Sequence, residues 1–195
     1  MCPDMFNMSK VKPKIVVVIG APAAGKTKLG REIARKLHLA VSDKDHVTGQ
    51  LLAAIMKDAG IEGQDYSQTD LNRFRNGIYG CMEDVAKDNL KVGMGTVIIS
   101  PYIDRNVKGW LDKLKKRVDS EGEADWSVVW IDIIPEEALK RIKERNSPRD
   151  VFKLANWERF ASKTYWGEPS CKHLRLDASL PFNEKVILAV NYVKR

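Results

Sequence analysis

Short apolar runs alternate along the chain with segments of helical periodicity. The first run, Lys14 to Ile19 (KIVVVI), is a continuous β-branched stretch of the kind that forms a strand buried on both faces. Other strand-length runs end near Ser42 and span Thr96 to Ser100, Ser127 to Ile134 and His173 to Leu176. Strands that alternate with helices predict a three-layer α/β/α sandwich with a parallel sheet.

The segments between these strands carry apolar residues at helical spacing. Pro135 is expected to open a helix in its first turn. Cys81 falls on the apolar face of a predicted helix and is interpreted as a small core residue. Further helices are expected over Lys26 to Leu39, Asp45 to Ala59 (with Val47, Leu51, Leu52, Ile55 and Met56 on one face), Thr69 to Leu90, Val107 to Val118, and Phe182 to Val193.

The length and composition favour a single compact domain. The 195 residues are 44% hydrophobic and 30% charged, which is ordinary for a soluble globular protein. Residues 1–13 are expected to form a flexible leader, and 14–195 one domain. No apolar run approaches the roughly 18–20 residues that span a bilayer, so no membrane partner is expected and the cytoplasm is the default location. The three cysteines form no CxxC pattern, which argues against a disulfide framework or a zinc site.

The net charge of +7 suits polyanionic partners, from nucleic acids to nucleotides and phosphorylated metabolites. Much of this charge follows amphipathic segments such as Lys108 to Arg117, and no aromatic residues interleave it as a nucleic-acid platform requires. A solvated helix face is therefore the preferred interpretation, and a nucleic-acid partner is possible but not favoured. The sequence does not indicate an oligomeric state.

One motif carries specific chemistry. The segment Gly20 to Thr27 (GAPAAGKT) matches the phosphate-binding loop G-x-x-x-x-G-K-[ST], between a predicted strand and a predicted helix. Its glycines permit the turn that points backbone N–H groups at an anion, and the helix dipole adds to the same site. Lys26 is expected to reach the β- and γ-phosphates and Thr27 to bind Mg²⁺. The residues expected to hold the nucleotide are Gly20, Ala21, Pro22, Ala23, Ala24, Gly25, Lys26 and Thr27.

Other signatures narrow the class of nucleotide-binding protein. No N-K-x-D guanine motif is present, which favours ATP over GTP. A motor ATPase would carry paired acids after an apolar strand, but Val97 to Pro101 has no acid at its tip, and Asp132 is interpreted as lying inside its strand. A small ATP- and Mg²⁺-dependent phosphotransferase is the class that remains.

On these residues the chain resembles the P-loop kinase superfamily. That superfamily includes gluconate kinase, chloramphenicol phosphotransferase, zeta-toxin-type kinases and the phage polynucleotide 5′-kinase, and the chain is most similar to kinase-like "AAA family ATPase" proteins. The resemblance covers nearly the whole chain in three blocks, of which the phosphate-binding loop is individually specific. It implies an α/β/α fold and an arginine-bearing lid over the nucleotide.

The second block is Ser42 to His46, directly after the second predicted strand. The resemblance implies an acid here that activates the acceptor hydroxyl, and Lys44-Asp45 is similar to the basic-Asp pair of the phage kinase. A carboxylate at the carboxyl end of a strand neighbouring the loop strand would lie in the ligand crevice. Asp45 is the candidate base; Asp43 is the rival, or a partner of the Mg²⁺ site. Asp45 could also serve as the N-cap of the helix.

The third block runs from Arg141 to Trp157 and resembles the kinase lid, expected at about 145–157. Arginine forks suit phosphate oxygens, so Arg145 or Arg149 is expected to stabilise the transferring phosphoryl group and Arg141 to help bind the nucleotide. Asp150 would orient Arg149. The alternative is an exposed helix end rich in cations.

The segment after the third strand supplies tentative acceptor contacts, Tyr102, Asp104 and Arg105, or else forms an ordinary turn. Asp43, Asp104 or water could complete the Mg²⁺ site. The predicted function is transfer of the γ-phosphoryl of ATP to a hydroxyl of a small molecule or nucleoside. The alternatives are a nucleic-acid end kinase and a nucleotide-dependent regulator.

Overall fold

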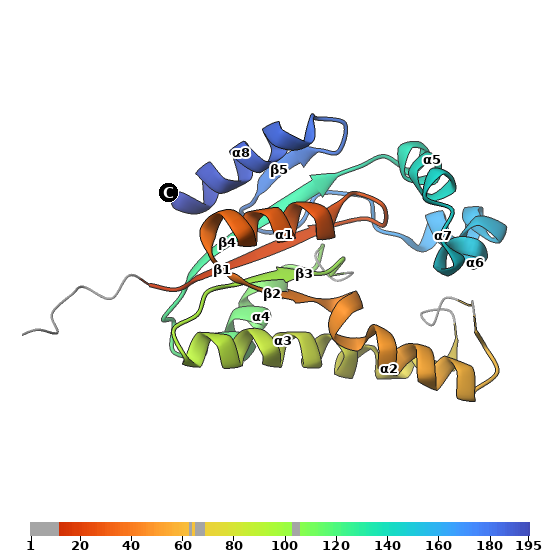
Figure 1. Cartoon of the computed structure of the whole chain (residues 1–195), viewed down its shortest axis with the longest axis horizontal. Helices are drawn as coiled ribbons and strands as arrows, with labels where there is room; N and C mark the ends of the chain where they lie inside the picture. Colours follow the sequence, from red (N-terminus) through yellow and green to blue (C-terminus); the bar gives the residue numbers. More distant parts are fainter. Residues whose placement is uncertain (1–11, 63, 65–68, 103–105) are drawn as a thin grey trace, which may run out of the picture.

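A computed structural model describes residues 12–62, 64, 69–102 and 106–195, and only the backbone at Arg149 (Figure 1). Most of the predicted leader therefore lies outside the described residues. All strand pairs are parallel, and the strand order is β2-β3-β1-β4-β5. The strands are β1 (Lys14–Gly20), β2 (Ala40–Asp43), β3 (Thr96–Ile99), β4 (Asp125–Asp132) and β5 (Leu174–Asp177).

Helices cover both faces of this sheet, which confirms the predicted three-layer sandwich. In Figure 1, α1 and α8 lie on one face and α3 and α4 on the other, while α5, α6 and α7 gather beyond the carboxyl end of the strands. The helices are α1 (Lys26–Leu37), α2 (Lys44–Asp58), η2 (Asp70–Phe74), α3 (Arg75–Lys91), α4 (Trp110–Val118), α5 (Pro135–Arg145), η3 (Pro148–Asp150), α6 (Val151–Ala155), α7 (Trp157–Lys163) and α8 (Phe182–Lys194).

Strand β1 is the centre of the core, as its β-branched run predicts. Val16 and Val18 pack into the cluster under α1 and α8, whereas Ile15, Val17 and Ile19 pack into the cluster under α3 and α4. All five side chains are fully buried. Alternate residues of a strand point to opposite faces, so a strand between two helix layers must be apolar throughout.

Several predicted boundaries differ from the structure. The helix expected over Thr69 to Leu90 is divided into η2 and α3, and α4 begins at Trp110 because Gly109 before it has a left-handed backbone (φ 80°). Strand β4 ends at Asp132, so this acid is the last residue of the strand and not an interior one. Its carboxylate pairs with Arg175 at 2.6 Å.

Two helical faces are less buried than their apolar pattern indicates. Cys81 is exposed, and the interpretation as a core residue is wrong because Met82, one position later, occupies the core of α3. The apolar stripe of α2 is largely exposed, with Leu51 at 65%. The reason is that α2 extends past the sheet in Figure 1 and packs mainly on α3.

Close packing of α1 on β3 fixes the helix that follows the phosphate-binding loop. A Cβ added at Gly30 would lie 2.5 Å from Cδ1 of Ile99, which is itself buried. We expect Gly30→Ala to lower the free energy of unfolding by about 1–3 kcal/mol in urea titrations, because the helix must move off the strand. Gly49→Ala in α2 is the matched control, since its Cβ meets nothing within 4 Å. It should raise stability by about 0.5–1 kcal/mol; equal losses in both variants would contradict the close-packing account.

No helix in the described part of the chain is both long and apolar enough to cross a membrane.

Candidate active site

The loop Gly20 to Gly25 joins the end of β1 to the start of α1 and has the backbone of an anion cradle. Gly25 is left-handed (φ 98°), Ala23 has φ 62°, and Gly20 has φ 151°. A Cβ at Gly20 would lie 2.6 Å from the carbonyl oxygen of Ile131 on β4. Only glycine therefore fits at the first position of the motif, as its chemistry predicts.

The N-terminus of α1 is open to an anion. Gly25 caps the helix without a side-chain hydrogen bond, and the first turn contains no acidic residue. The first N–H groups of a helix lack intrahelical partners and carry the positive end of the helix dipole. A phosphate group matches both features, so these residues fit a nucleotide.

Lys26 and Thr27 begin this helix and lie at the mouth of the loop. The Lys26 ammonium donates a hydrogen bond to the carbonyl oxygen of Ala21 (2.9 Å), which holds it across the loop. The Thr27 hydroxyl donates to Oδ2 of Asp43 (2.8 Å). A hydroxyl beside a buried carboxylate is a donor set that suits Mg²⁺, which prefers oxygen ligands and retains several waters.

Asp43 and Asp45 have different surroundings. Asp43 is 5% exposed, and its second oxygen accepts from the backbone N–H of Asp45 (3.0 Å). Asp43 is therefore the N-cap of α2, and the alternative role of Asp45 as the cap is wrong because the helix begins one residue earlier. The carboxylate of Asp45 is 62% exposed and pairs with the Lys44 ammonium at 2.6 Å.

The sheet order changes how these acids reach the loop. Strand β3 lies between β1 and β2, so the acid-bearing segment does not follow an immediate neighbour of the loop strand, as was expected. The hydrogen bond from Thr27 nevertheless brings Asp43 to the loop across β3. This is possible because parallel strands end at the same edge of the sheet.

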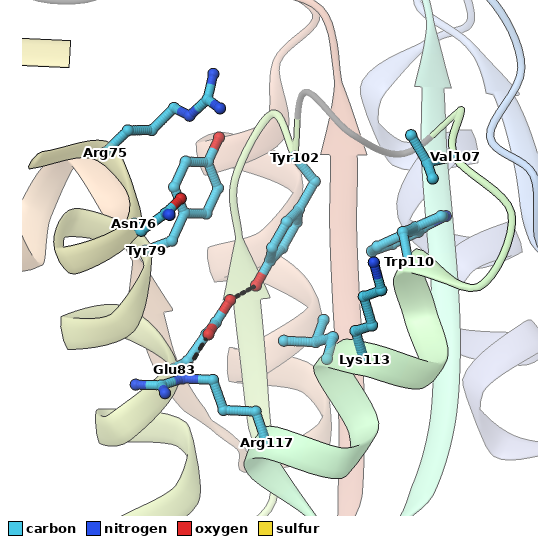
Figure 2. Close-up of a pocket in the computed structure, with 10 residues that line it drawn as sticks. Arg75, Asn76, Tyr79, Glu83, Tyr102, Val107, Trp110, Lys113 and Arg117 are labelled. Carbon is cyan, nitrogen blue, oxygen red and sulfur yellow. Dashed lines mark hydrogen bonds and ion pairs between the residues drawn. The ribbon is translucent and has the colours of Figure 1, made fainter. Parts of the chain in front are cut away.

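The segment after β3 lies at this same edge. The N–H of Ser100 donates to the carbonyl oxygen of Val18 (3.2 Å) beside the loop. Tyr102 has a left-handed backbone (φ 37°) and turns its ring between α3 and α4, where its hydroxyl donates to Glu83 (3.3 Å) (Figure 2). Burial raises the pKa of Tyr102 well above its ordinary value. Asp104 and Arg105 lie outside the described residues.

The arginines of the expected lid have specific partners. Arg141 donates to Glu137 (2.7 Å) and to the carbonyl oxygen of Ala178 (3.0 Å), which joins α5 to the loop after β5. Arg145 pairs with the fully buried carboxylate of Asp150 at 2.6 Å. The partners of Asp150 among the described side chains are Arg145 and Lys153. The predicted pair of Asp150 with Arg149 stays untested, because the side chain of Arg149 lies outside the described residues.

Aromatic side chains support the base of this segment. The ring centroids of Trp157 and Phe160 are 5.7 Å apart, and Trp157 is 6.2 Å from Trp166. Trp157 and Trp166 also pack against the core cluster beneath α1 and α8. Helix α7 is therefore anchored to the domain through these rings.

Sequence reasoning missed a second group of residues beside the loop. A cavity of about 490 Å³ adjoins Thr27 and is bounded by Lys28, Arg31 and Phe182. The Lys28 ammonium lies 4.3 Å from the centre of the Phe182 ring. The sequence feature that could have identified this group is the position of Phe182 after β5, because the carboxyl ends of all parallel strands lie at the ligand-binding edge of the sheet.

Within the described ranges, no group of three or more histidine, cysteine, aspartate or glutamate side chains could hold a metal ion.

Comparisons with known proteins agree with this architecture. The family model described as "AAA domain" matches residues 15–165. A gluconokinase from Sinorhizobium meliloti 1021 superposes with a TM-score of 0.61 at 16% identity, covering 94% of this chain and 93% of that one. The Mycobacterium tuberculosis APS kinase in complex with AMPPNP and APS has a TM-score of 0.61 at 17% identity, with 94% and 99% covered. A sugar kinase from Janibacter sp. HTCC2649 has a TM-score of 0.61 at 19% identity, with 93% and 95% covered.

A sequence search of curated proteins found no match. The match to the family model extends from β1 to the residues that follow α7, and the similarity in fold extends over nearly the whole of each kinase compared. The predicted resemblance to P-loop kinases is thereby confirmed at the level of the fold. This chain belongs to the AAA domain family and has the fold of the P-loop kinases.

Proposed function

We propose that this protein is a kinase that transfers the γ-phosphoryl group of ATP to a hydroxyl of a small molecule or nucleoside. The observation that carries the proposal is the hydrogen bond between Thr27 and Asp43, which brings a buried acid to the phosphate-binding loop. Three of the compared structures are named as a gluconokinase, a sugar kinase and an APS kinase, which supports a small acceptor.

In the proposed mechanism the donor is held by the loop. The N–H groups of the loop and of the first turn of α1 bind the phosphates, and the Lys26 ammonium exchanges its bond to Ala21 for phosphate oxygens. Thr27 would bind Mg²⁺, with Asp43 orienting the hydroxyl. Mg²⁺ held by these residues would supply positive charge that offsets the negative charge of the phosphates.

Asp45 is the proposed base. Its exposed carboxylate would accept the proton of the acceptor hydroxyl as that oxygen bonds to the γ-phosphorus and the bond to the β-phosphate oxygen breaks. The products are ADP and the phosphorylated alcohol. The ion pair with Lys44 holds the carboxylate at the start of α2.

The segment 145–157 is the proposed lid. Arg145 or Arg149 would contact the transferring phosphoryl group, and closure would exclude water from it. For Arg145 this requires release from Asp150, whose carboxylate also has the Lys153 ammonium 3.6 Å away and therefore keeps a cation when Arg145 leaves. Arg141 is the proposed further contact to the nucleotide.

The proposal is tested by ADP production from ATP and Mg²⁺ across a panel of acceptors. The panel contains sugars and sugar acids, nucleosides, aromatic alcohols and oligonucleotide 5′ ends. We expect at least one small acceptor to raise ADP production and to appear as a phosphorylated product in mass spectrometry. A slow rate that no acceptor changes would contradict a kinase and support a nucleotide-dependent regulator. Stimulation by oligonucleotides alone would identify a nucleic-acid end kinase.

A further inference from the structure

A cavity of about 450 Å³ lies between α3 and α4 (Figure 2). This volume is in the range of small-molecule binding sites. Its walls combine aromatic rings, cationic side chains and one partly buried acid, Glu83. The residues that line it are Arg75, Asn76, Tyr79, Glu83, Tyr102, Val107, Trp110, Lys113, Leu114 and Arg117.

Three aromatic rings form the walls. Tyr102 lies between the other two, with its ring centre 5.3 Å from that of Tyr79 and 5.4 Å from that of Trp110. Trp110 and Tyr102 are buried, so their position is fixed by the core. Walls made of rigid rings favour a planar ring system, which they contact by stacking or edge-to-face packing.

The floor of the cavity is a balanced polar network. Glu83 accepts the hydrogen bond from Tyr102 and pairs with Arg117 at 2.7 Å. Arg117 also pairs with Asp84 at 2.9 Å, so two carboxylates offset its charge. Burial raises the pKa of Glu83, although Arg117 opposes the shift. The polar and charged groups of this network are paired with one another, so the network supplies no net attraction for an anion.

The rim supplies that attraction. Arg75 at the start of α3 and Lys113 on α4 both line the cavity. Among the residues that the structure describes, neither has an ion pair with a carboxylate. An acidic group on a ligand would gain a charge-assisted contact from either of these cations.

The cavity is connected through Tyr102 to the edge of the sheet at which the phosphate-binding loop lies. Tyr102 follows β3, which pairs directly with β1, and Ser100 two residues earlier bonds to Val18 near the end of β1. The upper wall of the cavity thus begins at the edge of the sheet where the loop lies. A ligand held between α3 and α4 can extend toward Lys26 and Thr27 from this side.

We propose that the cavity between α3 and α4 recognises the phosphoryl acceptor, and that this acceptor is a planar aromatic ring compound with an acidic group and a free hydroxyl. This inference rests on the proposed kinase function and adds the substrate class. A polyhydroxylated sugar acid matches the rim cations but gains little from three aromatic walls. An uncharged aromatic alcohol matches the walls but leaves the cations without a partner.

Binding is measured by calorimetry with Mg²⁺ and a saturating non-hydrolysable ATP analogue, so that no probe can occupy the donor site. The two aromatic anions are adenosine monophosphate and para-(hydroxymethyl)benzoate. Adenosine and benzyl alcohol are the control compounds that lack the acidic group. Ribose phosphate and gluconate are the control compounds that lack the aromatic ring. At least one aromatic anion should bind about tenfold or more tightly than all its control compounds. The proposal is overturned if neither does.

Two variants assign the binding to this cavity. Lys113→Gln should weaken binding of the aromatic anion roughly fivefold, whereas Lys116→Gln, on the same helix but outside the cavity, should leave it unchanged. Tyr79→Leu should weaken it about tenfold through loss of stacking. Equal effects of Lys113→Gln and Lys116→Gln would overturn the assignment. Both lysines are exposed on α4, so neither replacement disturbs the hydrophobic core.

Measurements of turnover distinguish a failure of this inference from a failure of the proposed kinase function. The aromatic anion that binds should stimulate ADP production, and Lys113→Gln should raise its KM with little change in kcat. Stimulation by gluconate that Lys113→Gln does not alter would preserve the kinase but overturn the aromatic acceptor. Binding of an aromatic anion without stimulated ADP production would overturn its assignment as acceptor.

Discussion

Replacing Lys26 by alanine is expected to lower acceptor-stimulated ADP production by at least about a hundredfold. Lys26 is the one side chain of the loop with a permanent charge at the mouth of the cradle, and its ammonium already lies across the loop on the carbonyl oxygen of Ala21. Its loss removes a cation from the phosphates during transfer, while the loop backbone remains. Initial rates of ADP formation at saturating ATP and acceptor measure the effect.

Lys36→Ala is the matched control for this variant. Lys36 lies in the last turn of the same helix, is exposed and is far along α1 from the loop. Its replacement should leave the rate unchanged, and both variants should unfold at similar temperatures. A Lys26→Ala protein with normal turnover would contradict the proposed role of the loop in catalysis.

The second large effect is expected from the two acids at the start of α2. Asp43→Asn should raise the Mg²⁺ concentration needed for half-maximal activity about 10- to 100-fold, because the amide cannot orient Thr27 as the carboxylate does. Asp45→Asn should instead lower kcat about a hundredfold or more at every Mg²⁺ concentration, because the acceptor proton loses its base. Steady-state kinetics across a Mg²⁺ titration separate the two results.

Asparagine is a suitable replacement at both positions. It caps helices about as well as aspartate does, so α2 should keep its N-cap in Asp43→Asn. Asp58→Asn at the exposed far end of α2 controls for loss of charge on the helix. If Asp43→Asn lowered kcat without a change in Mg²⁺ dependence and Asp45→Asn were normal, Asp43 would be the base and the proposed roles would be reversed.

The donor half of the candidate site was predictable because its chemistry is local. Eight consecutive residues place the glycines, the lysine and the threonine, and the strand before them and the helix after them follow from short-range patterns. The structure has each of these elements, with Gly20 and Gly25 in backbone conformations that favour glycine. The spacing of residues within such a motif is sufficient to predict its local geometry.

The acceptor half was less predictable because it depends on contacts between distant residues. Asp43 and Asp45 are two positions apart and carry the same side chain, yet only Asp43 is buried against Thr27. Tyr102 was predicted beside the acceptor, and its ring lies between α3 and α4, among residues to which the sequence pattern had assigned no role. Nothing in the local pattern indicates which helix a side chain will contact.

The sequence by itself determined the parallel α/β architecture, the phosphate-binding loop and therefore the class of ligand. Hydrophobic periodicity and glycine conformation act within a few residues, so a single chain is sufficient to predict them. Tertiary structure alone decided the strand order that joins Thr27 to Asp43 across β3, the exposure of α2, and the cavity between α3 and α4. These features arise from packing between segments far apart in the chain, where burial and side-chain partners depend on every neighbouring element at once.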